Sequence, residues 1–150
     1  MTNMTNSIYN IRDIKKNDDI SVLNELSSVD ADVGLCNEFC EFINLLNDNH
    51  RVVVFEIKIN ENETIIAGIG TIFIERKIIH SFGKVGHIED IAVSKLYRGL
   101  GIGKNIVDYL INYAKEKGCY KAVLNCSNDN ITFYEKCDLK LKSNQMSIYF

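Results

Sequence analysis

The sequence predicts an α/β (α+β) domain built on a central mixed, mostly antiparallel sheet that is flanked by helices. Two observations carry this prediction. Three β-branched, apolar segments, 51–60, 64–75 and 85–93, follow one another across short connections, which is typical of adjacent antiparallel strands. A helical pattern from Lys104 onward then separates 85–93 from another apolar run at 122–126, and a strand–helix–strand unit places its two strands parallel.

The first third of the chain is predicted to form one strand and two helices. Residues 9–14 have the pattern of a short strand, and Asp18 or Asp19 can cap a helix. The apolar residues of that helix are Ile20, Val22, Leu23 and Leu26. A second amphipathic helix follows, because its apolar residues recur at helical spacing: Cys36, Phe39, Cys40, Ile43 and Leu46. The polar residues 47–49 end this helix.

The last third is predicted to continue as helix, strand, helix and strand. One face of the first of these helices is lined by Ile106, Val107, Leu110, Ile111 and Ala114. Gly118 stands where the C-terminus of that helix favours a positive φ. Residues 122–126 are then expected as a strand, 130–137 as a short helix and 146–149 as a final strand. Because no internal repeat interrupts this order, residues 1–150 are predicted to form a single domain.

Composition and charge exclude several function classes. The chain is 46% hydrophobic and 25% charged, which is average for a globular domain. With 17 basic and 20 acidic residues its formal net charge is −3, so no global positive field exists to recruit nucleic acid or an anionic membrane. No apolar run approaches the ~18 residues that span a bilayer, and the N-terminus lacks a secretory pattern. We expect a cytoplasmic protein with no nucleic-acid or membrane partner.

Cysteine usage points to a reducing compartment and to no metal. The five cysteines are an odd number, and they form no CxxC pair with zinc-ligand spacing: Cys36, Cys40, Cys119, Cys126 and Cys137. We interpret them as thiols that behave as small apolar side chains.

A glycine-rich turn after segment 85–93 is the most informative part of the sequence. It reads Arg98-Gly99-Leu100-Gly101-Ile102-Gly103-Lys104 and opens the following helix. Glycines allow backbone N–H groups to converge, and the helix N-terminus adds partial positive charge, so the turn predicts a pyrophosphate cradle. A Walker loop would need glycine at 98 and Ser or Thr at 105, but these positions hold Arg98 and Asn105. A dinucleotide fingerprint would need glycine at 104, which is Lys104, so neither motif is present. A tight connection with no ligand is the remaining alternative.

The turn does match Arg/Gln-x-x-Gly-x-Gly/Ala through Arg98, Gly101 and Gly103, and in this it resembles the GNAT acetyltransferases. The order of elements agrees, because the motif precedes a strand and an Asn-x-x-Phe-Tyr segment that begins at Asn130. More specifically, the chain is similar to the glucosamine-6-phosphate N-acetyltransferases. The blocks that carry this similarity are Ile74–His80, Gly86–Val93, Gly118–Lys121 and Phe133–Cys137. The resemblance covers nearly the whole chain and is weakest before residue 50.

The resemblance implies where each substrate binds. Acetyl-CoA, as co-substrate, would contact Asn130 through its pantetheine arm and Tyr134 near its sulfur. It would also lie along the strand edge and the glycine turn: Ile91, Ala92, Val93, Arg98, Gly99, Leu100, Gly101, Ile102, Gly103 and Lys104. Glu89 and Asp90 would face the sugar amine. The sugar phosphate and hydroxyls would lie among Lys77, His80, Tyr120 and Lys121. The family also implies a homodimer.

Two positions depart from the family pattern. Asn125 stands where a carboxylate near the amine is usual, so it is a candidate for both catalysis and substrate binding. Tyr149 stands where the family usually has an arginine that reaches the phosphate of the partner subunit's ligand. The first departure affects proton handling and the second affects phosphate recognition.

Acetyl transfer to a protonated amine needs a proton acceptor, a donor to the oxyanion and an acid near the departing thiolate. We expect Glu89 to be the acceptor, acting through water, although a salt bridge to Arg or Lys is the usual use of such a carboxylate. A backbone N–H near Ile91, freed by a strand bulge or splay, would polarise the carbonyl. Tyr134 would protonate the sulfur. His87 is expected to be structural.

The sequence thus predicts direct acetyl transfer in a ternary complex. The products would be N-acetylglucosamine 6-phosphate and CoA, as in UDP-N-acetylglucosamine biosynthesis. Cys126 is the one candidate nucleophile for an acyl-enzyme route. Two other functions stay open: a GNAT transferase for another amine, such as a peptide N-terminus, and a catalytically weak acyl-CoA-binding module.

Overall fold

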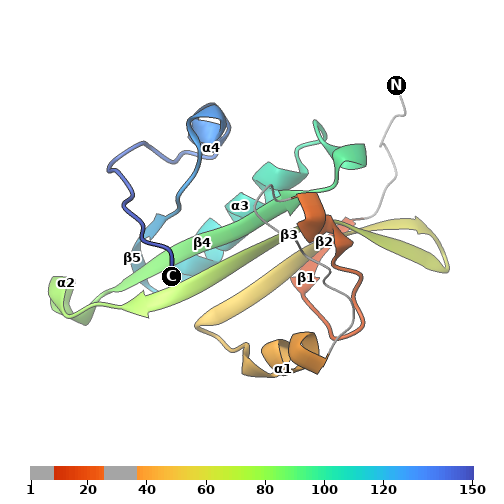
Figure 1. The fold of residues 1–150 in the computed structure, drawn as a ribbon, viewed down its shortest axis with the longest axis horizontal. Coiled ribbons are helices and arrows are strands. Elements are labelled where there is room, and N and C mark those ends of the chain that lie inside the picture. Colours follow the sequence, from red (N-terminus) through yellow and green to blue (C-terminus); the bar gives the residue numbers. More distant parts are fainter. Residues whose placement is uncertain (1–8, 26–36) are drawn as a thin grey trace.

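A five-stranded sheet with helices on both faces forms the molecule in a computed structural model, which describes residues 9–25 and 37–150 (Figure 1). The strands lie side by side in chain order. They are β1 (Tyr9–Asp13), β2 (His50–Asn60), β3 (Glu63–Arg76), β4 (Lys84–Val93) and β5 (Cys119–Val123). The first four pair antiparallel, and β5 pairs parallel to β4. This confirms the predicted mixed, mostly antiparallel sheet.

Alternation of side chains along β2 divides the core into two layers. Val53 and Phe55 face α3 (Ile102–Glu116), whose buried residues Ile106 and Leu110 follow the predicted apolar stripe. Val52 and Val54 face the opposite way. They pack with residues of the 3-10 helix η1 (Ser21–Glu25) and of α1 (Asn37–Leu45), namely Val22 and Phe39. The sheet is therefore held between α3 on one face and the N-terminal elements on the other.

The helix predicted to follow Asp18 or Asp19 is only the short η1. Asp19 does accept a hydrogen bond from the Ser21 N–H at 2.9 Å, as an N-cap residue would. Asp18 has another use, because it accepts two bonds from the Arg12 guanidinium at 2.8 and 2.9 Å. Leu26 and Cys36, which were predicted to extend the two helices, lie outside the described residues.

The C-terminal elements differ from the sequence prediction in their bounds. The strand predicted at 122–126 begins at Cys119 and ends at Val123, and the helix predicted at 130–137 is a 3-10 turn, η3 (Asn128–Asn130), followed by α4 (Ile131–Glu135). The strand predicted at 146–149 is wrong for this chain, since 136–150 contain no helix or strand. Met146 and Tyr149 are instead 96% and 93% exposed.

The loop between β3 and β4 contains a left-handed turn, α2 (Ile79–Phe82), at the far end of the long hairpin (Figure 1). Three successive residues without a glycine, His80, Ser81 and Phe82, have φ of 54°, 54° and 58°. A further 3-10 turn, η2 (Lys95–Tyr97), follows β4. In the described part of the chain, no helix has the length and apolarity needed to cross a membrane.

Candidate active site

A bulge in β4 lies beside the two acidic residues of the strand. Ile69 of β3 pairs with Ala92, and Thr71 pairs with Glu89, so Asp90 and Ile91 together stand opposite Gly70. Asp90 takes a φ of 54° to accommodate the extra residue. A bulge leaves one residue without its ladder partner, which makes a backbone N–H available near Ile91. The predicted irregularity is therefore present.

Beyond the bulge, the edge of β4 that faces β5 is open. The last pair between these strands joins His87 to Val123, where β5 ends, so residues 88–93 of β4 extend past the parallel ladder. Ala92 is buried in the core layer with η1 and α1, whereas Ile91 and Val93 pack against the α3 layer. Because these side chains serve the core, a ligand along this edge meets mainly the backbone.

The glycine turn follows β4 and begins α3. Gly99 and Gly101 take φ of 81° and 80°, and no described atom lies within 4 Å of a Cβ added to either residue. The N–H groups of the first helical turn have no intrahelical partner and point out of the helix N-terminus. A Cβ on Gly103 would lie 3.1 Å from the Phe133 ring, so this glycine lets α4 approach α3. The conformation fits the predicted anion cradle.

The two cationic side chains of the turn already have partners. Arg98 donates from Nε to the Val93 carbonyl at 3.2 Å and from Nη2 to Glu25 at 3.2 Å. Lys104 donates to Asp108 at 2.7 Å, one helical turn further on. Of the other predicted contacts, Ile102 belongs to the core and Leu100 is half exposed. The cradle is thus a backbone site with its lysine and arginine tied to the scaffold.

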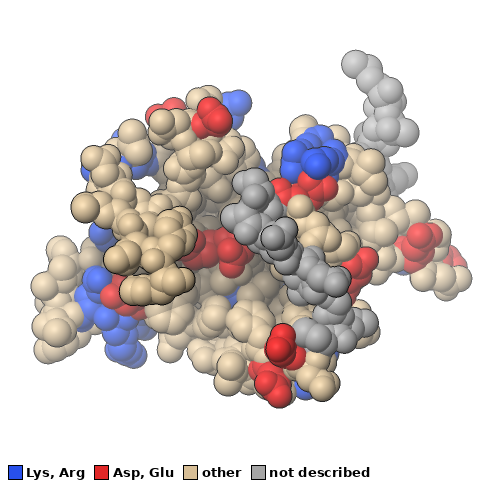
Figure 2. All heavy atoms as spheres, in the orientation of Figure 1, with Lys and Arg blue, Asp and Glu red and all other residues tan. Residues whose placement is uncertain are grey.

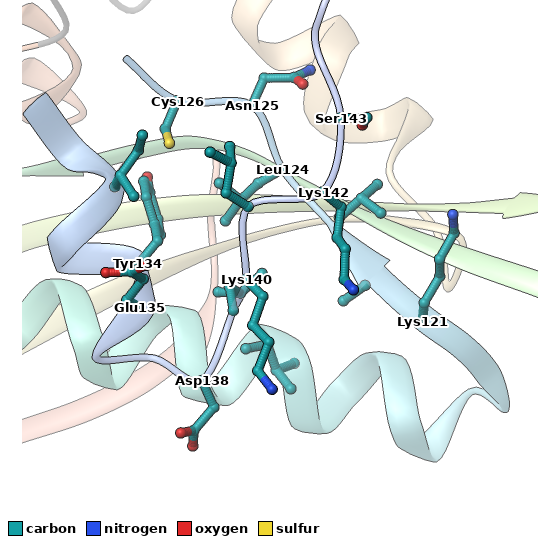
Figure 3. A pocket seen from close by; sticks show the side chains of 16 residues that line it. Lys121, Leu124, Asn125, Cys126, Tyr134, Glu135, Asp138, Lys140, Lys142 and Ser143 are labelled. Atoms are coloured by element: carbon teal, nitrogen blue, oxygen red, sulfur yellow. The ribbon is translucent and has the colours of Figure 1, made fainter. Parts of the chain in front are cut away.

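Tyr134 on α4 lies beside a cavity of about 490 Å³ between β5, α4 and the segment 138–143. Figure 3 shows Tyr134 and Cys126 at one end of this cavity, and Lys121 and Lys142 at the other, while Asn125 also contributes to its lining. Burial raises the pKa of Tyr134 to about 12, and the nearby thiols and Glu89 act in the same direction. The hydroxyl therefore stays protonated at neutral pH and can donate a proton. Asn130 is exposed at the start of α4.

Glu89 has the electrostatics of a base rather than of a salt-bridge partner. Desolvation raises the pKa of its carboxyl, the neighbouring Asp90 raises it further, and His87 opposes the shift. Across residues 9–25 and 37–150, no ion pair to Lys or Arg involves Glu89. The charge of Glu89 adds a small further rise to the pKa of Tyr134.

The residues predicted to bind the sugar fall into two groups. The His80 ring packs against the Tyr120 ring at a tilt of 38°, with centroids 4.3 Å apart, and the Lys121 ammonium lies 5.7 Å from the centre of the Tyr120 ring. These three residues join α2 to β5. Lys77 is not part of this group, because its ammonium donates to Glu75 at 2.8 Å.

Two functional contacts lie beyond what the sequence motifs show. Glu75 also lies 2.8 Å from Nε2 of His87, so His87 belongs to a polar network next to Glu89 as well as to the sheet. Glu25 contacts Arg98 from 73 positions away, and nothing in the local pattern around Glu25 indicates this. Among the described residues, no three His, Cys, Asp or Glu side chains gather into a group that could hold a metal.

A bulged, open strand edge that leads into a glycine-lined helix N-terminus fits a ligand with phosphate groups, and the acyl-CoA-dependent transferases are a class of protein with such a ligand. The chain belongs to the acetyltransferase (GNAT) family, whose model matches residues 15–139. Within that family it belongs to the glucosamine 6-phosphate N-acetyltransferases, as the following relatives show.

The glucosamine 6-phosphate N-acetyltransferase of Arabidopsis thaliana is 44% identical over 110 residues, which is 73% of this chain and 72% of that protein. Its namesake in Candida albicans is 49% identical over 76 residues, 51% of each chain. The crystal structure of the Arabidopsis thaliana enzyme matches with a TM-score of 0.85 at 37% identity, over 95% of this chain and 99% of that chain. A predicted acetyltransferase with acetyl-CoA from Clostridium acetobutylicum shares the fold, at a TM-score of 0.68 and 22% identity over 95% of this chain and 96% of that chain.

Proposed function

We propose that this protein transfers the acetyl group of acetyl-CoA to the amine of glucosamine 6-phosphate, giving N-acetylglucosamine 6-phosphate and CoA. The observation that carries the proposal is the β4 bulge. The bulge interrupts the β3–β4 ladder next to Glu89, on an open edge that leads into the glycine turn, and this supports a free backbone N–H near Ile91 as the donor to the oxyanion. The amino-sugar substrate is inferred from the names of the relatives in Arabidopsis thaliana and Candida albicans. The reaction would provide the N-acetyl group in UDP-N-acetylglucosamine biosynthesis.

In the proposed reaction Glu89 accepts a proton from the sugar ammonium through a water molecule. The free amine forms a C–N bond with the thioester carbonyl, and the N–H at the bulge stabilises the resulting oxyanion. When the C–S bond breaks, the Tyr134 hydroxyl donates its proton to the sulfur, and the second proton, which the nitrogen loses as the amide forms, restores the Tyr134 hydroxyl. One proton is released overall. Direct attack by the amine needs no acyl-enzyme, so Cys126→Ser is expected to stay active.

For the acceptor, we propose that Glu89 and Asp90 hold the amine end and that His80, Tyr120 and Lys121 hold the phosphate end. Lys77 contributes to phosphate binding by exchanging its contact with Glu75 for one with the phosphate. Asn125 and Tyr134 line the same cavity. Asn125 has an amide at the position where a carboxylate is usual in the family. Its proposed role is to orient the substrate by hydrogen bonds.

We also propose that the protein is a homodimer. On the face seen in Figure 2, uncharged residues cover the tip that carries α2 and the region of the C-terminus, and a cluster of basic residues lies beside them. Ile78, Ile79 and Phe82 at the hairpin end, and Met146 and Tyr149 near the C-terminus, are exposed apolar or aromatic residues. Exposed apolar side chains of this kind are typical of a protein–protein contact.

The decisive experiment measures thiol release from acetyl-CoA with glucosamine 6-phosphate, glucosamine and a peptide with a free N-terminus. We expect the highest kcat/KM with glucosamine 6-phosphate. Lys121→Ala or Lys77→Ala should lower the ratio of kcat/KM for glucosamine 6-phosphate to kcat/KM for glucosamine. A charge-assisted hydrogen bond contributes about 1.5–3 kcal/mol, so each loss is expected to be roughly 10-fold or more. A preference for the peptide would identify a different acceptor, and CoA binding without turnover would identify a binding module.

A further inference from the structure

The carboxylate of Glu25 contacts the loop between β4 and the glycine turn at three donors. Its Oε1 accepts a hydrogen bond from the Lys95 backbone N–H at 3.4 Å. Its Oε2 accepts one from Arg98 Nη2 at 3.2 Å and lies 3.4 Å from the Lys95 ammonium. The Glu25 side chain is only 20% exposed, whereas those of Lys95 and Arg98 are 74% and 53% exposed. The Glu25 carboxylate is therefore held by its surroundings, and the two exposed cationic side chains bind to it.

The same contacts connect the two parts of the site on which acetyl transfer depends. Arg98 reaches from Glu25 back to the carbonyl of Val93, the last residue of the open β4 edge. The cradle begins directly after Arg98, with positive φ at Gly99 and Gly101. A displacement of Arg98 would thus move the start of the cradle relative to β4.

We propose that Glu25 is a positioning residue for acetyl-CoA binding, which holds the loop 95–98 so that the backbone N–H groups of the glycine turn converge on the pyrophosphate. The inference rests on the proposed use of acetyl-CoA. Glu25 does not touch the co-substrate in this role; it acts through Lys95 and Arg98. Arg98, in turn, serves mainly to tie the loop to β4 and η1 rather than to bind phosphate with its side chain.

Charge alone would give the opposite result. Lys95 and Arg98 carry two positive charges, and Glu25 cancels one of them, so a simple electrostatic account has Glu25 weakening the binding of an anion. Exposed charges in water contribute little, about 0–1 kcal/mol per pair. Backbone donors depend strongly on direction, and small errors in position are costly in such sites. Positioning therefore outweighs charge here, and removal of Glu25 should weaken binding.

The test is calorimetric titration of CoA into the full-length protein and its Glu25→Ala and Glu25→Gln variants. We expect Glu25→Ala to weaken CoA binding roughly 10-fold, since the loop 95–98 loses the contacts that hold the glycine turn in position. Glu25→Gln keeps one acceptor oxygen and should lose about threefold. Glu61→Gln, in the exposed β2–β3 turn, makes the same change of net charge and should bind CoA normally.

A second measurement separates positioning from general damage. Kinetics with acetylpantetheine, a thioester without the pyrophosphate, should be nearly unchanged in both Glu25 variants, as should the KM of the amino sugar. Equal or tighter CoA binding by Glu25→Ala would overturn the proposal in favour of the charge account. Equal losses with CoA and acetylpantetheine would overturn it in favour of a structural role. If Ala does not fold, Gln decides. CoA titration needs no acceptor, so these outcomes stand even if the acceptor is another amine.

Discussion

At the scale of single residues, desolvation raises the pKa of both proton-handling groups, Glu89 and Tyr134. It raises the pKa of the Glu89 carboxyl, which makes Glu89 a better proton acceptor than an ordinary glutamate. It also raises the pKa of Tyr134 to about 12, so the hydroxyl is protonated at neutral pH, as that of an ordinary tyrosine is, and it is a weaker acid than an ordinary tyrosine. A base and an acid near one open strand edge are what transfer between an amine and a thioester requires.

Glu89→Gln removes the acceptor while keeping the shape of the side chain. We expect kcat to fall about 10²- to 10⁴-fold, the range that general bases contribute. In the wild type, activity should be lost as the pH falls through the raised pKa of Glu89, so the acid limb should lie above the usual range of a glutamate. A pH–rate profile of both proteins measures this. Full activity with an unchanged acid limb would remove Glu89 from the mechanism.

The same pKa shift has a sign for stability. A carboxyl whose pKa is raised on folding favours the folded state at low pH, and that contribution is lost as the pH rises through the folded pKa. Ionised Glu89 therefore lowers the free energy of unfolding at neutral pH. We expect Glu89→Gln to raise Tm at pH 7 relative to the wild type, and to raise it less at pH 4. An equal change in Tm at both pH values would contradict this explanation.

Tyr134→Phe deletes only the hydroxyl and keeps the ring, which meets Phe133 edge-on with centroids 4.9 Å apart. If Tyr134 protonates the leaving sulfur, kcat should fall at least 10-fold while the KM values for both substrates change little. Steady-state kinetics with each substrate varied in turn is the measurement. A variant with normal kcat and a lower Tm would instead make Tyr134 a packing residue.

Local sequence made some of these residues predictable and others not. Glu89, Tyr134 and the glycines lie in contiguous motifs, so a resemblance could assign them roles. Lys77 could be recognised as a candidate, but its ion pair with Glu75 depends on side-chain placement across a strand end. Glu25 gave no signal, because its contact with Arg98 exists only after η1 has packed on β4.

At the scale of elements, one helix offers a matched test of the anion cradle. Gly101 and Gly118 stand at opposite ends of α3, both with positive φ, 80° and 76°, and with no described atom close to an added Cβ. Alanine at either position bears the same backbone strain, about 1–2 kcal/mol. The two variants thus differ in what lies near them and not in intrinsic cost.

We expect Gly101→Ala to weaken CoA binding 10-fold or more, because it shifts N–H groups at the helix N-terminus where the pyrophosphate is held. Gly118→Ala should show a similar loss of Tm with normal CoA affinity. Calorimetry for CoA and thermal unfolding of both variants provide the comparison. If the two variants bind CoA equally well, the glycine turn is only a tight connection.

The bounds of helices and strands were predicted well where the apolar pattern is long. They were predicted poorly where pairing with neighbouring strands sets the bounds. The β2–β3 hairpin and α3 have many residues in register with one period, and their bounds came out within two residues. β5 begins and ends three residues earlier than predicted. Its bounds are set by its pairing with β4, which runs from Lys84 and Cys119 to His87 and Val123. The 146–149 segment has strand-forming residues but no neighbouring strand in this chain, and a strand needs a partner for its backbone.

At the scale of the whole molecule, the exposed apolar surfaces at α2 and at the C-terminus are the part of the structure that a single chain leaves unexplained. Tyr149 and Met146 are almost fully exposed, so they contribute nearly nothing to the core of this chain. Removing them should leave the monomer fold intact. Any loss of stability on their removal would then come from lost contact with another chain.

We therefore expect light scattering to give about twice 17.1 kDa for the wild type and close to the monomer mass for a chain that ends at Asn144. Because association stabilises the folded state by mass action, Tm should rise with concentration for the wild type and stay constant for the shortened chain. Ile79→Ser at the hairpin end should also weaken the dimer. Ile59→Ser is the matched control, since Ile59 is similarly exposed, 49% against 60%, but lies at the end of β2. A wild-type mass of one chain at all concentrations would disprove the dimer.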